Sequence, residues 1–185
     1  MTSLTTSLRQ TKTSTILGTV GFALVLAMAA QVTAPIPGTP VPFSLQPMIV
    51  VLAGLMLGPV AGAASMALYL VMGAAGLPVF SPVPGLPQGI ARFVGPTGGY
   101  LIAYPIAAYI TGVLAGKQST YFRRFIAACA GIAMIFVGGI AQLSILNQSF
   151  VRAIDLGITP FVPLDAVKAL IAAGIATPRK MSSRA

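Results

Sequence analysis

The stretch Arg92-Phe-Val-Gly-Pro-Thr-Gly-Gly-Tyr100 leads directly into the apolar run Leu101–Leu114. Glycine tolerates positive φ and proline fixes its own φ, so Gly95-Pro96 and Gly98-Gly99 predict a sharp, close-packed entry into a helix. Arg92 keeps its charge, so near lipid it needs a counter-ion, water or an anionic ligand. The stretch therefore predicts a membrane helix with a functional cation at its entrance.

The composition of the whole chain is that of an integral membrane protein. Of its 185 residues, 56% are hydrophobic and 7% are charged, whereas soluble domains carry roughly 25% charged residues. The net charge of +9 would suggest nucleic acid in a soluble chain. Here the cations cluster in the tails and one loop, so we expect membrane lipids with anionic headgroups as their partners, and no nucleic acid.

Six apolar segments predict an all-α integral membrane fold, a six-transmembrane-helix bundle. The predicted helices cover about 16–32, 44–57, 60–75, 100–114, 125–146 and 164–176. We expect a cytoplasmic disordered tail at 1–15, the membrane domain at 16–177 and a cytoplasmic basic tail at 178–185. The first segment resembles a signal peptide, but it is interpreted as a retained helix because its small residues stay inside the apolar run and five more spans follow.

The distribution of cations predicts the orientation. Eight of them lie in the two tails and in the loop after the fourth helix, whereas Arg92 and Arg152 lie in loops on the other side and Lys168 lies in the last helix. The positive-inside rule therefore predicts a multi-pass protein of the inner (cytoplasmic) cell membrane with both termini in the cytoplasm. The Pro-rich strap Pro35–Pro42 then lies outside, where we interpret it as a lid over the bundle.

Asp165 and Lys168 carry charge at the start of the last helix, three residues apart and so on one face. An ionised group in a span costs about 2.5–3.5 kcal/mol, so such groups are rarely idle. They either pair only with each other or contribute to a ligand site. With Arg92 they leave one surplus cation, which suits a small, mainly apolar ligand that has one carboxylate and N–H groups for Asp165. The predicted apolar wall consists of Phe43, Leu45, Phe80, Tyr100 and Phe161.

Other chemistry is sparse. The chain has no histidine and one cysteine, Cys129, so a Cys/His metal site is not expected. It has no phosphate-binding loop of the Gly-x-x-x-x-Gly-Lys-Ser/Thr type, so it cannot use ATP itself. A membrane-embedded enzyme would have only Asp155 and Asp165 as acids and no histidine base. We therefore expect no enzyme and no cofactor; the alternative is an enzyme or carrier for another small carboxylate.

Five strings carry a resemblance to a known family. They are Pro40-Val-Pro-Phe-Ser-Leu-Gln46, Leu52-Ala-Gly-Leu-Met-Leu-Gly-Pro59, Tyr69-Leu-Val-Met-Gly-Ala-Ala-Gly-Leu-Pro-Val-Phe80, Gly95-Pro-Thr-Gly-Gly-Tyr100 and Asp165-Ala-Val-Lys168. With them the chain resembles the BioY family, the biotin-binding S subunits of energy-coupling-factor (ECF) vitamin transporters. The resemblance implies a six-helix S-component fold that binds biotin with high affinity near the outer face, beneath the first loop.

The resemblance also implies partners and site residues. Biotin uptake would require a separate transmembrane coupling subunit and ATPase subunits, and ATP would be used only there. The implied substrate-binding residues are Arg92, Asp165, Lys168, Gln46, Phe80, Ser81 and Tyr100. Ala23 and Ala27, four residues apart, would form the docking face for the coupling subunit. After Phe80 this chain departs from the family pattern, so Ser81 would replace a missing ligand-binding residue or that contact is lost.

Overall fold

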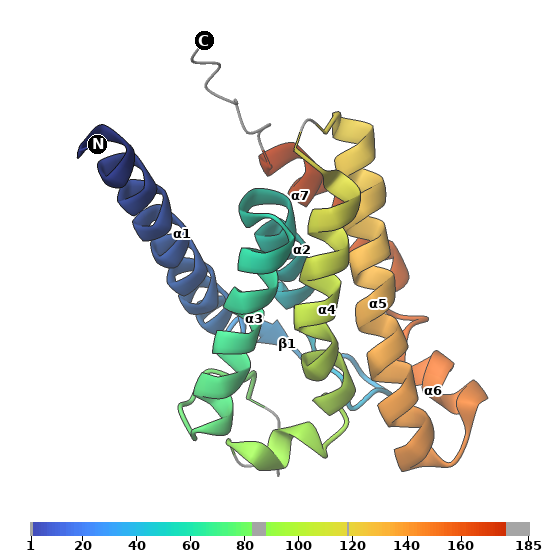
Figure 1. The fold of residues 1–185 in the computed structure, drawn as a ribbon. Helices are drawn as coiled ribbons and strands as arrows, with labels where there is room; N and C mark the ends of the chain where they lie inside the picture. Colours follow the sequence, from blue (N-terminus) through green and yellow to red (C-terminus); the bar gives the residue numbers. More distant parts are fainter. Residues whose placement is uncertain (1, 83–87, 118, 177–185) are drawn as a thin grey trace.

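The computed structural model describes residues 2–82, 88–117 and 119–176. Seven α-helices, one 3-10 helix and a two-stranded ribbon make up this part of the chain (Figure 1). In chain order they are α1 (Thr2–Ala29), β1 (Thr33–Ala34), β2 (Phe43–Ser44), α2 (Gln46–Leu57), α3 (Pro59–Ala74), η1 (Ile90–Phe93), α4 (Gly98–Ala115), α5 (Tyr121–Asn147), α6 (Phe150–Gly157) and α7 (Val162–Ile175).

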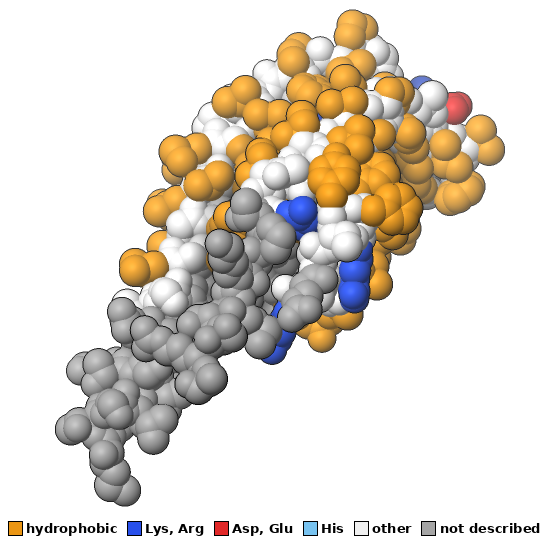
Figure 2. Space-filling model, turned by 90° about the horizontal axis from the view of Figure 1, so that it is seen from above, with side chains coloured by type: hydrophobic (Ala, Val, Ile, Leu, Met, Phe, Trp, Pro, Cys, Tyr) orange, Lys and Arg blue, Asp and Glu red, His pale blue; other side chains and the backbone are white. Residues whose placement is uncertain are grey.

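The helices fit a membrane bundle, which confirms the predicted fold class. Helices α4 and α5 are each long and apolar enough to cross a membrane, and α6 with α7, bent by 54°, pass the same test as a pair. Helices α2, α3 and the part of α1 from Thr13 to Ala29 are shorter apolar helices. Large hydrophobic side chains are exposed on the outside of the bundle, and Figure 2 shows them on one face, as is expected where lipid is the solvent.

Helix α4 lies inside the bundle, in contact with α2, α3 and α5. Its entry is as close-packed as the sequence predicts. A Cβ atom at Gly98 would overlap the backbone of Phe93, and one at Gly99 would overlap the backbone of Gly138 on α5. Close approach rather than positive φ requires these glycines, because the positive φ of this loop occurs at Gly89. Glycine therefore sets the spacing of α4 and α5 where α4 begins.

Two segments differ from the prediction. Helix α1 begins at Thr2, although residues 1–15 were expected to be disordered; no proline or glycine interrupts this segment, so the helix of the apolar run extends backwards without a new nucleation step. Helix α6 lies inside the predicted loop 147–163. The side chain of Ser149 caps it by accepting a hydrogen bond from the Arg152 amide at 3.3 Å, a local signal that the apolar pattern did not reveal.

The two ends of the Pro-rich strap are joined by a short β-ribbon, and its middle is hydrogen-bonded to α6. Strand β1 pairs antiparallel with β2, with Thr33 opposite Ser44. Further along, the Thr39 hydroxyl donates a hydrogen bond to the carbonyl of Leu156 in α6 at 2.6 Å. Figure 1 shows the start of α1 and the end of α7 at one end of the bundle and α6 towards the other. Helix α6 therefore holds the strap at the end of the bundle opposite to the start of α1.

Candidate functional site

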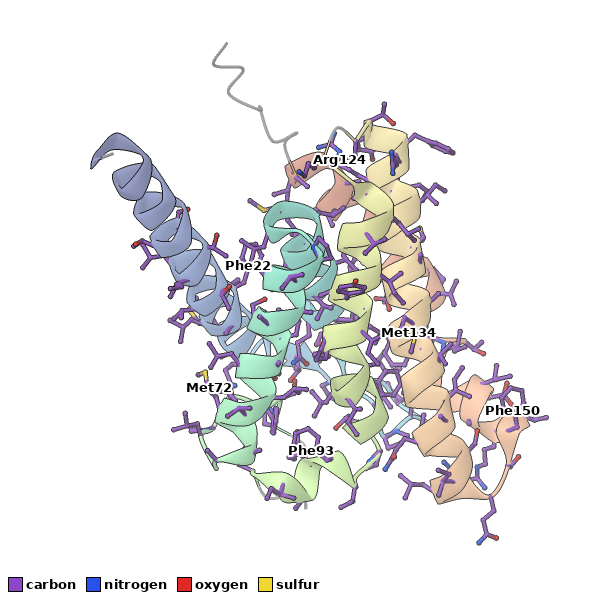
Figure 3. All side chains as sticks on the ribbon, in the orientation of Figure 1. Phe22, Met72, Phe93, Arg124, Met134 and Phe150 are labelled. Atoms are coloured by element: carbon purple, nitrogen blue, oxygen red, sulfur yellow. The ribbon has the colours of Figure 1, made fainter. Side chains whose placement is uncertain are left out.

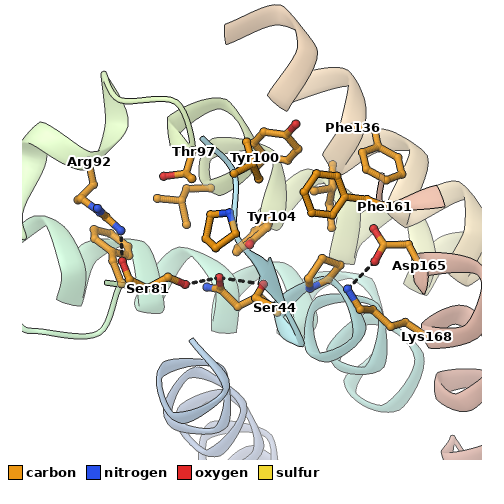
Figure 4. A pocket seen from close by; sticks show the side chains of 17 residues that line it. Ser44, Ser81, Arg92, Thr97, Tyr100, Tyr104, Phe136, Phe161, Asp165 and Lys168 are labelled. Carbon is orange, nitrogen blue, oxygen red and sulfur yellow. Dashed lines mark hydrogen bonds and ion pairs between the residues drawn. The ribbon is translucent and has the colours of Figure 1, made fainter. Parts of the chain in front are cut away.

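A pocket lies between the strap, the loop that carries η1, and helices α2, α4, α5 and α7 (Figure 4). Its empty space amounts to about 610 Å³, part of which is open to solvent. All seven substrate-binding residues expected from the sequence line it: Gln46, Phe80, Ser81, Arg92, Tyr100, Asp165 and Lys168. Of the other expected wall residues, Phe161 lines the pocket, whereas Phe43 and Leu45 do not.

Asp165 and Lys168 form a buried ion pair on one side of the pocket. The Lys168 Nζ lies 2.5 Å from Asp165 Oδ1, and each side chain is 5% exposed. The same ammonium group stands 4.2 Å from the centre of the Phe43 ring, an attractive cation–π contact. The two side chains thus pair with each other and also line the pocket.

Arg92 lies at the other side of the pocket, on η1 (Figure 4). It is 1% exposed, and its Nη2 donates a hydrogen bond to the backbone carbonyl of Ser81. Among the residues that the structure describes, Nε and Nη1 of Arg92 have no hydrogen-bond partner. Burial lowers the pKa of the guanidinium, but arginine remains charged in proteins. The fold therefore holds a buried cation with two unused donors beside the pocket.

A chain of hydrogen bonds joins the strap to the loop that carries Arg92. The side-chain oxygen of Gln46 accepts from the Ser81 hydroxyl at 2.8 Å and from the Ser44 hydroxyl at 3.4 Å. Its nitrogen donates to the Tyr69 hydroxyl at 2.8 Å, which in turn donates to the carbonyl of Val79 at 3.1 Å. In this structure the Ser81 hydroxyl therefore connects its loop to Gln46, and the Ser81 carbonyl holds Arg92. The sequence alone did not predict this positioning role.

Aromatic rings fix the loop after α3. Phe80 is fully buried and meets Tyr69 and Phe93 edge to face, with ring centres 5.4 Å and 5.6 Å apart. Figure 3 shows the Phe93 side chain pointing from η1 towards the bundle. On the opposite wall, the Tyr100 hydroxyl donates to the carbonyl of Gly157 at 2.9 Å, which links α4 to α6. Phe80 therefore holds the loop after α3, and Tyr100 holds α6 against α4.

Sequence reasoning missed several polar residues of the site. Ser44, Thr97 and Tyr104 also line the pocket, and Tyr69 supports it from behind through Gln46. Thr97 lies within the Gly95–Tyr100 string, where its position just before a predicted helix is a signal for a functional hydroxyl. Tyr69 and Tyr104 could not, because an aromatic residue in an apolar helix is ordinarily part of the core.

Ala23 and Ala27 do not form an open stripe in this structure. Ala23 is fully buried, and Ala27 packs against the same core cluster as Ala23. Helix α1 makes its most extensive contacts with α3, and small side chains allow that close approach. Ala23 is thus covered by the chain itself, whereas Ala27 is half-buried. The exposed face of α1 carries Leu17, Leu24 and Met28 instead.

Comparisons with known proteins agree with this architecture. The BioY family matches residues 2–184 of the chain. The chain is 40% identical over 158 residues to a probable biotin transporter BioY of Pyrococcus horikoshii, a match that covers 84% of this chain and 89% of that protein. It is 36% identical over 155 residues to the biotin transporter BioY of Thermotoga maritima, with the same coverage.

The fold agrees with a solved structure as well. The crystal structure of the S-component for biotin from an ECF-type ABC transporter superposes with a TM-score of 0.81 at 27% sequence identity, over 90% of each chain. The expectations of a BioY relative and of an S-component fold are confirmed. On its sequence over almost its full length, and on its fold, the chain belongs to the BioY family.

Proposed function

We propose that this protein binds biotin in the pocket described above and is the substrate-binding subunit for biotin uptake. The observation that carries the proposal is that one largely apolar pocket has two polar ends of different chemistry. At one end the buried Arg92 has two nitrogens without a hydrogen-bond partner among the described residues, and at the other Asp165 and Lys168 form a buried pair. Between them lie aromatic side chains such as Phe161 and Tyr100.

Biotin has matching chemistry at each end. Its carboxylate is the natural partner for Arg92, because guanidinium binds carboxylates through two parallel hydrogen bonds. Its ureido group has two N–H donors for the Asp165 carboxylate and a carbonyl oxygen that accepts from the Lys168 ammonium. The thioether ring and the aliphatic chain suit the apolar wall. The sequence left open which cation meets the carboxylate; the pairing of Lys168 with Asp165 favours Arg92.

The proposal includes a transport assembly. The sequence has no ATP-binding loop, so energy comes from separate ATPase subunits joined through a transmembrane coupling subunit. The similarity to the S-component of an ECF-type ABC transporter supports this division of labour.

We place the protein in the inner membrane with both termini in the cytoplasm. Arg124 on α5 lies at the same end of the bundle as the start of α1 (Figure 3). Figure 2, seen from that end, shows Lys and Arg side chains gathered there. This distribution supports the orientation, because cations accumulate on the cytoplasmic side of membrane proteins. The pocket then opens towards the outside.

Binding of labelled biotin to the purified protein in detergent tests the proposal. We expect saturable capture of one biotin per chain, displaced by unlabelled biotin. Lipoate, which has a carboxylate and an apolar sulfur ring but no ureido group, should not displace it. Absence of saturable biotin binding by folded protein would overturn the proposal. Tighter binding of lipoate than of biotin would indicate a carrier for another small carboxylate.

A further inference from the structure

Thr97 stands five residues after Arg92 and also lines the pocket. Its hydroxyl oxygen is buried and has no hydrogen-bond partner among the described residues. Figure 4 shows Thr97 on the same side of the pocket as Arg92. A buried hydroxyl without a partner is costly and calls for an explanation. Two unsatisfied groups, this hydroxyl and the Arg92 guanidinium, thus line one pocket.

Thr97 stands just before α4, at a position where a threonine hydroxyl ordinarily has a hydrogen-bond partner. Thr97 is the N-cap residue of α4, where threonine ordinarily accepts a hydrogen bond from an amide of the first turn. Its side chain makes no such capping bond here. The first-turn amides of Gly99 and Tyr100 precede the helix's own hydrogen-bond ladder, and the dipole of this 18-residue helix favours an anion at that end.

The turn before α4 is held firmly, so the backbone that carries Thr97 does not have to be ordered when a ligand arrives. The Gly98 amide donates to the carbonyl of Gly95 at 3.0 Å, and the Leu101 amide donates to the Thr97 carbonyl at 3.2 Å. The Gln142 side chain of α5 donates to the carbonyls of Phe93 and Gly95, each at 3.5 Å. A preorganised donor costs a ligand less free energy on binding.

We propose that the Thr97 hydroxyl and the first turn of α4 complete, with Arg92, the subsite that holds the ligand's carboxylate. Thr97 donates to one carboxylate oxygen while the unused nitrogens of Arg92 donate to the carboxylate from the other side. Thr97 is thereby a specificity residue that selects an ionised acid over its neutral amide. This inference rests on the proposed function and identifies which end of the ligand α4 recognises.

The test compares Thr97→Val with the wild type, using biotin and biotinamide as the two probes. Valine keeps the shape and removes the hydroxyl, so affinity for biotin should fall about tenfold, the effect of losing one hydrogen bond to a charged group. Affinity for biotinamide should change by less than about twofold, because the neutral amide gains little from this donor. Thr97→Ser, which retains the hydroxyl, should keep the preference for the acid. Thr111→Val is the control, because it removes the hydroxyl of a buried threonine inside α4, which donates to the carbonyl of Ala107 and does not line the pocket.

Equal weakening of biotin and biotinamide by Thr97→Val, or no weakening, would overturn the assignment of Thr97. If Thr97→Val does not fold, the same comparison is made with Thr97→Ala. The wild type supplies an independent measure, since equal affinity for acid and amide would exclude an anion subsite at α4 while leaving biotin binding intact. Failure of the wild type to bind biotin at all would instead overturn the proposed function.

Discussion

The ammonium of Lys168 lies 2.5 Å from the carboxylate of Asp165, one helical turn earlier on α7, and both side chains are almost fully buried. Ion pairs that are removed from water are poor stabilisers compared with apolar residues of the same size. Stability therefore does not explain this pair well, whereas the ligand binding proposed above does, because both side chains line the pocket. Asp165 is acceptor-only when ionised, and one of its oxygens contacts Lys168, which leaves acceptor capacity for a ligand.

Asp165→Asn should weaken biotin and biotinamide alike. The substitution keeps the volume of the side chain but replaces an ionised acceptor with a neutral amide. A hydrogen bond to a charged group contributes about 1.5–3 kcal/mol, or roughly ten- to a hundredfold in affinity. Both ligands keep the ureido group, so titration of each in detergent should give the same loss. Unchanged affinity in a folded variant would mean that Asp165 serves only Lys168.

The two cations should respond differently to replacement by methionine. Arg92→Met should strongly reduce the preference for biotin over biotinamide, because the carboxylate loses its charged partner and keeps only the Thr97 hydroxyl and the first turn of α4. Lys168→Met should leave the preference and weaken both ligands, because Asp165 then remains buried without a counter-ion, a change that costs about 3–5 kcal/mol. Thermal unfolding should detect that loss of stability. The opposite pattern in the ligand titrations would assign the carboxylate to Lys168.

Ser81→Ala should act on the carboxylate end from a distance. It removes the 2.8 Å hydrogen bond to Gln46 and loosens the loop whose Ser81 carbonyl accepts from Arg92. We expect a loss of about 1 kcal/mol of stability, typical of one hydrogen bond, and a several-fold lower affinity for biotin. Ser65→Ala is the matched control, because it removes a buried hydroxyl of α3 that donates to the carbonyl of Gly62. Equal affinity losses in both variants would exclude a specific role for Ser81.

Gly73→Ala should displace Phe80. A Cβ atom at Gly73 would overlap the Phe80 ring, so the ring and the following Ser81 must move. Overpacking of this kind costs about 1–3 kcal/mol, and biotin affinity should fall with it. Gly21→Ala on α1 is the control, since its Cβ would meet nothing within 4 Å and alanine favours a helix. Biotin affinity that survives Gly73→Ala would show that the loop tolerates movement.

The sequence predicted the main helices because each is an apolar run bounded by Pro, Gly or charge. It predicted Arg92, Asp165 and Lys168 because ionised groups beside such runs stand out, whereas Gln46 and Ser81 were expected only from the resemblance to a family. It did not predict α6, whose cap is a local hydrogen bond, or the start of α1, where no strong signal separates helix from tail. It also could not show that Ala23 is buried in the core, or that Gln46 contacts Ser81, because such long-range contacts depend on how the helices pack.

Cysteine labelling should establish the orientation of the bundle. In a Cys129→Ala background, which removes the native thiol, single cysteines at Pro37 in the strap and at Arg152 on α6 are exposed and lie at the end of the pocket. A cysteine at Ser119 lies in the connection between α4 and α5. An impermeant maleimide added to intact cells should label Pro37→Cys and Arg152→Cys, whereas Ser119→Cys should react only after the membrane is opened. Labelling of Ser119→Cys in intact cells would reverse the orientation and place the pocket on the cytoplasmic side, where it could not capture biotin from outside.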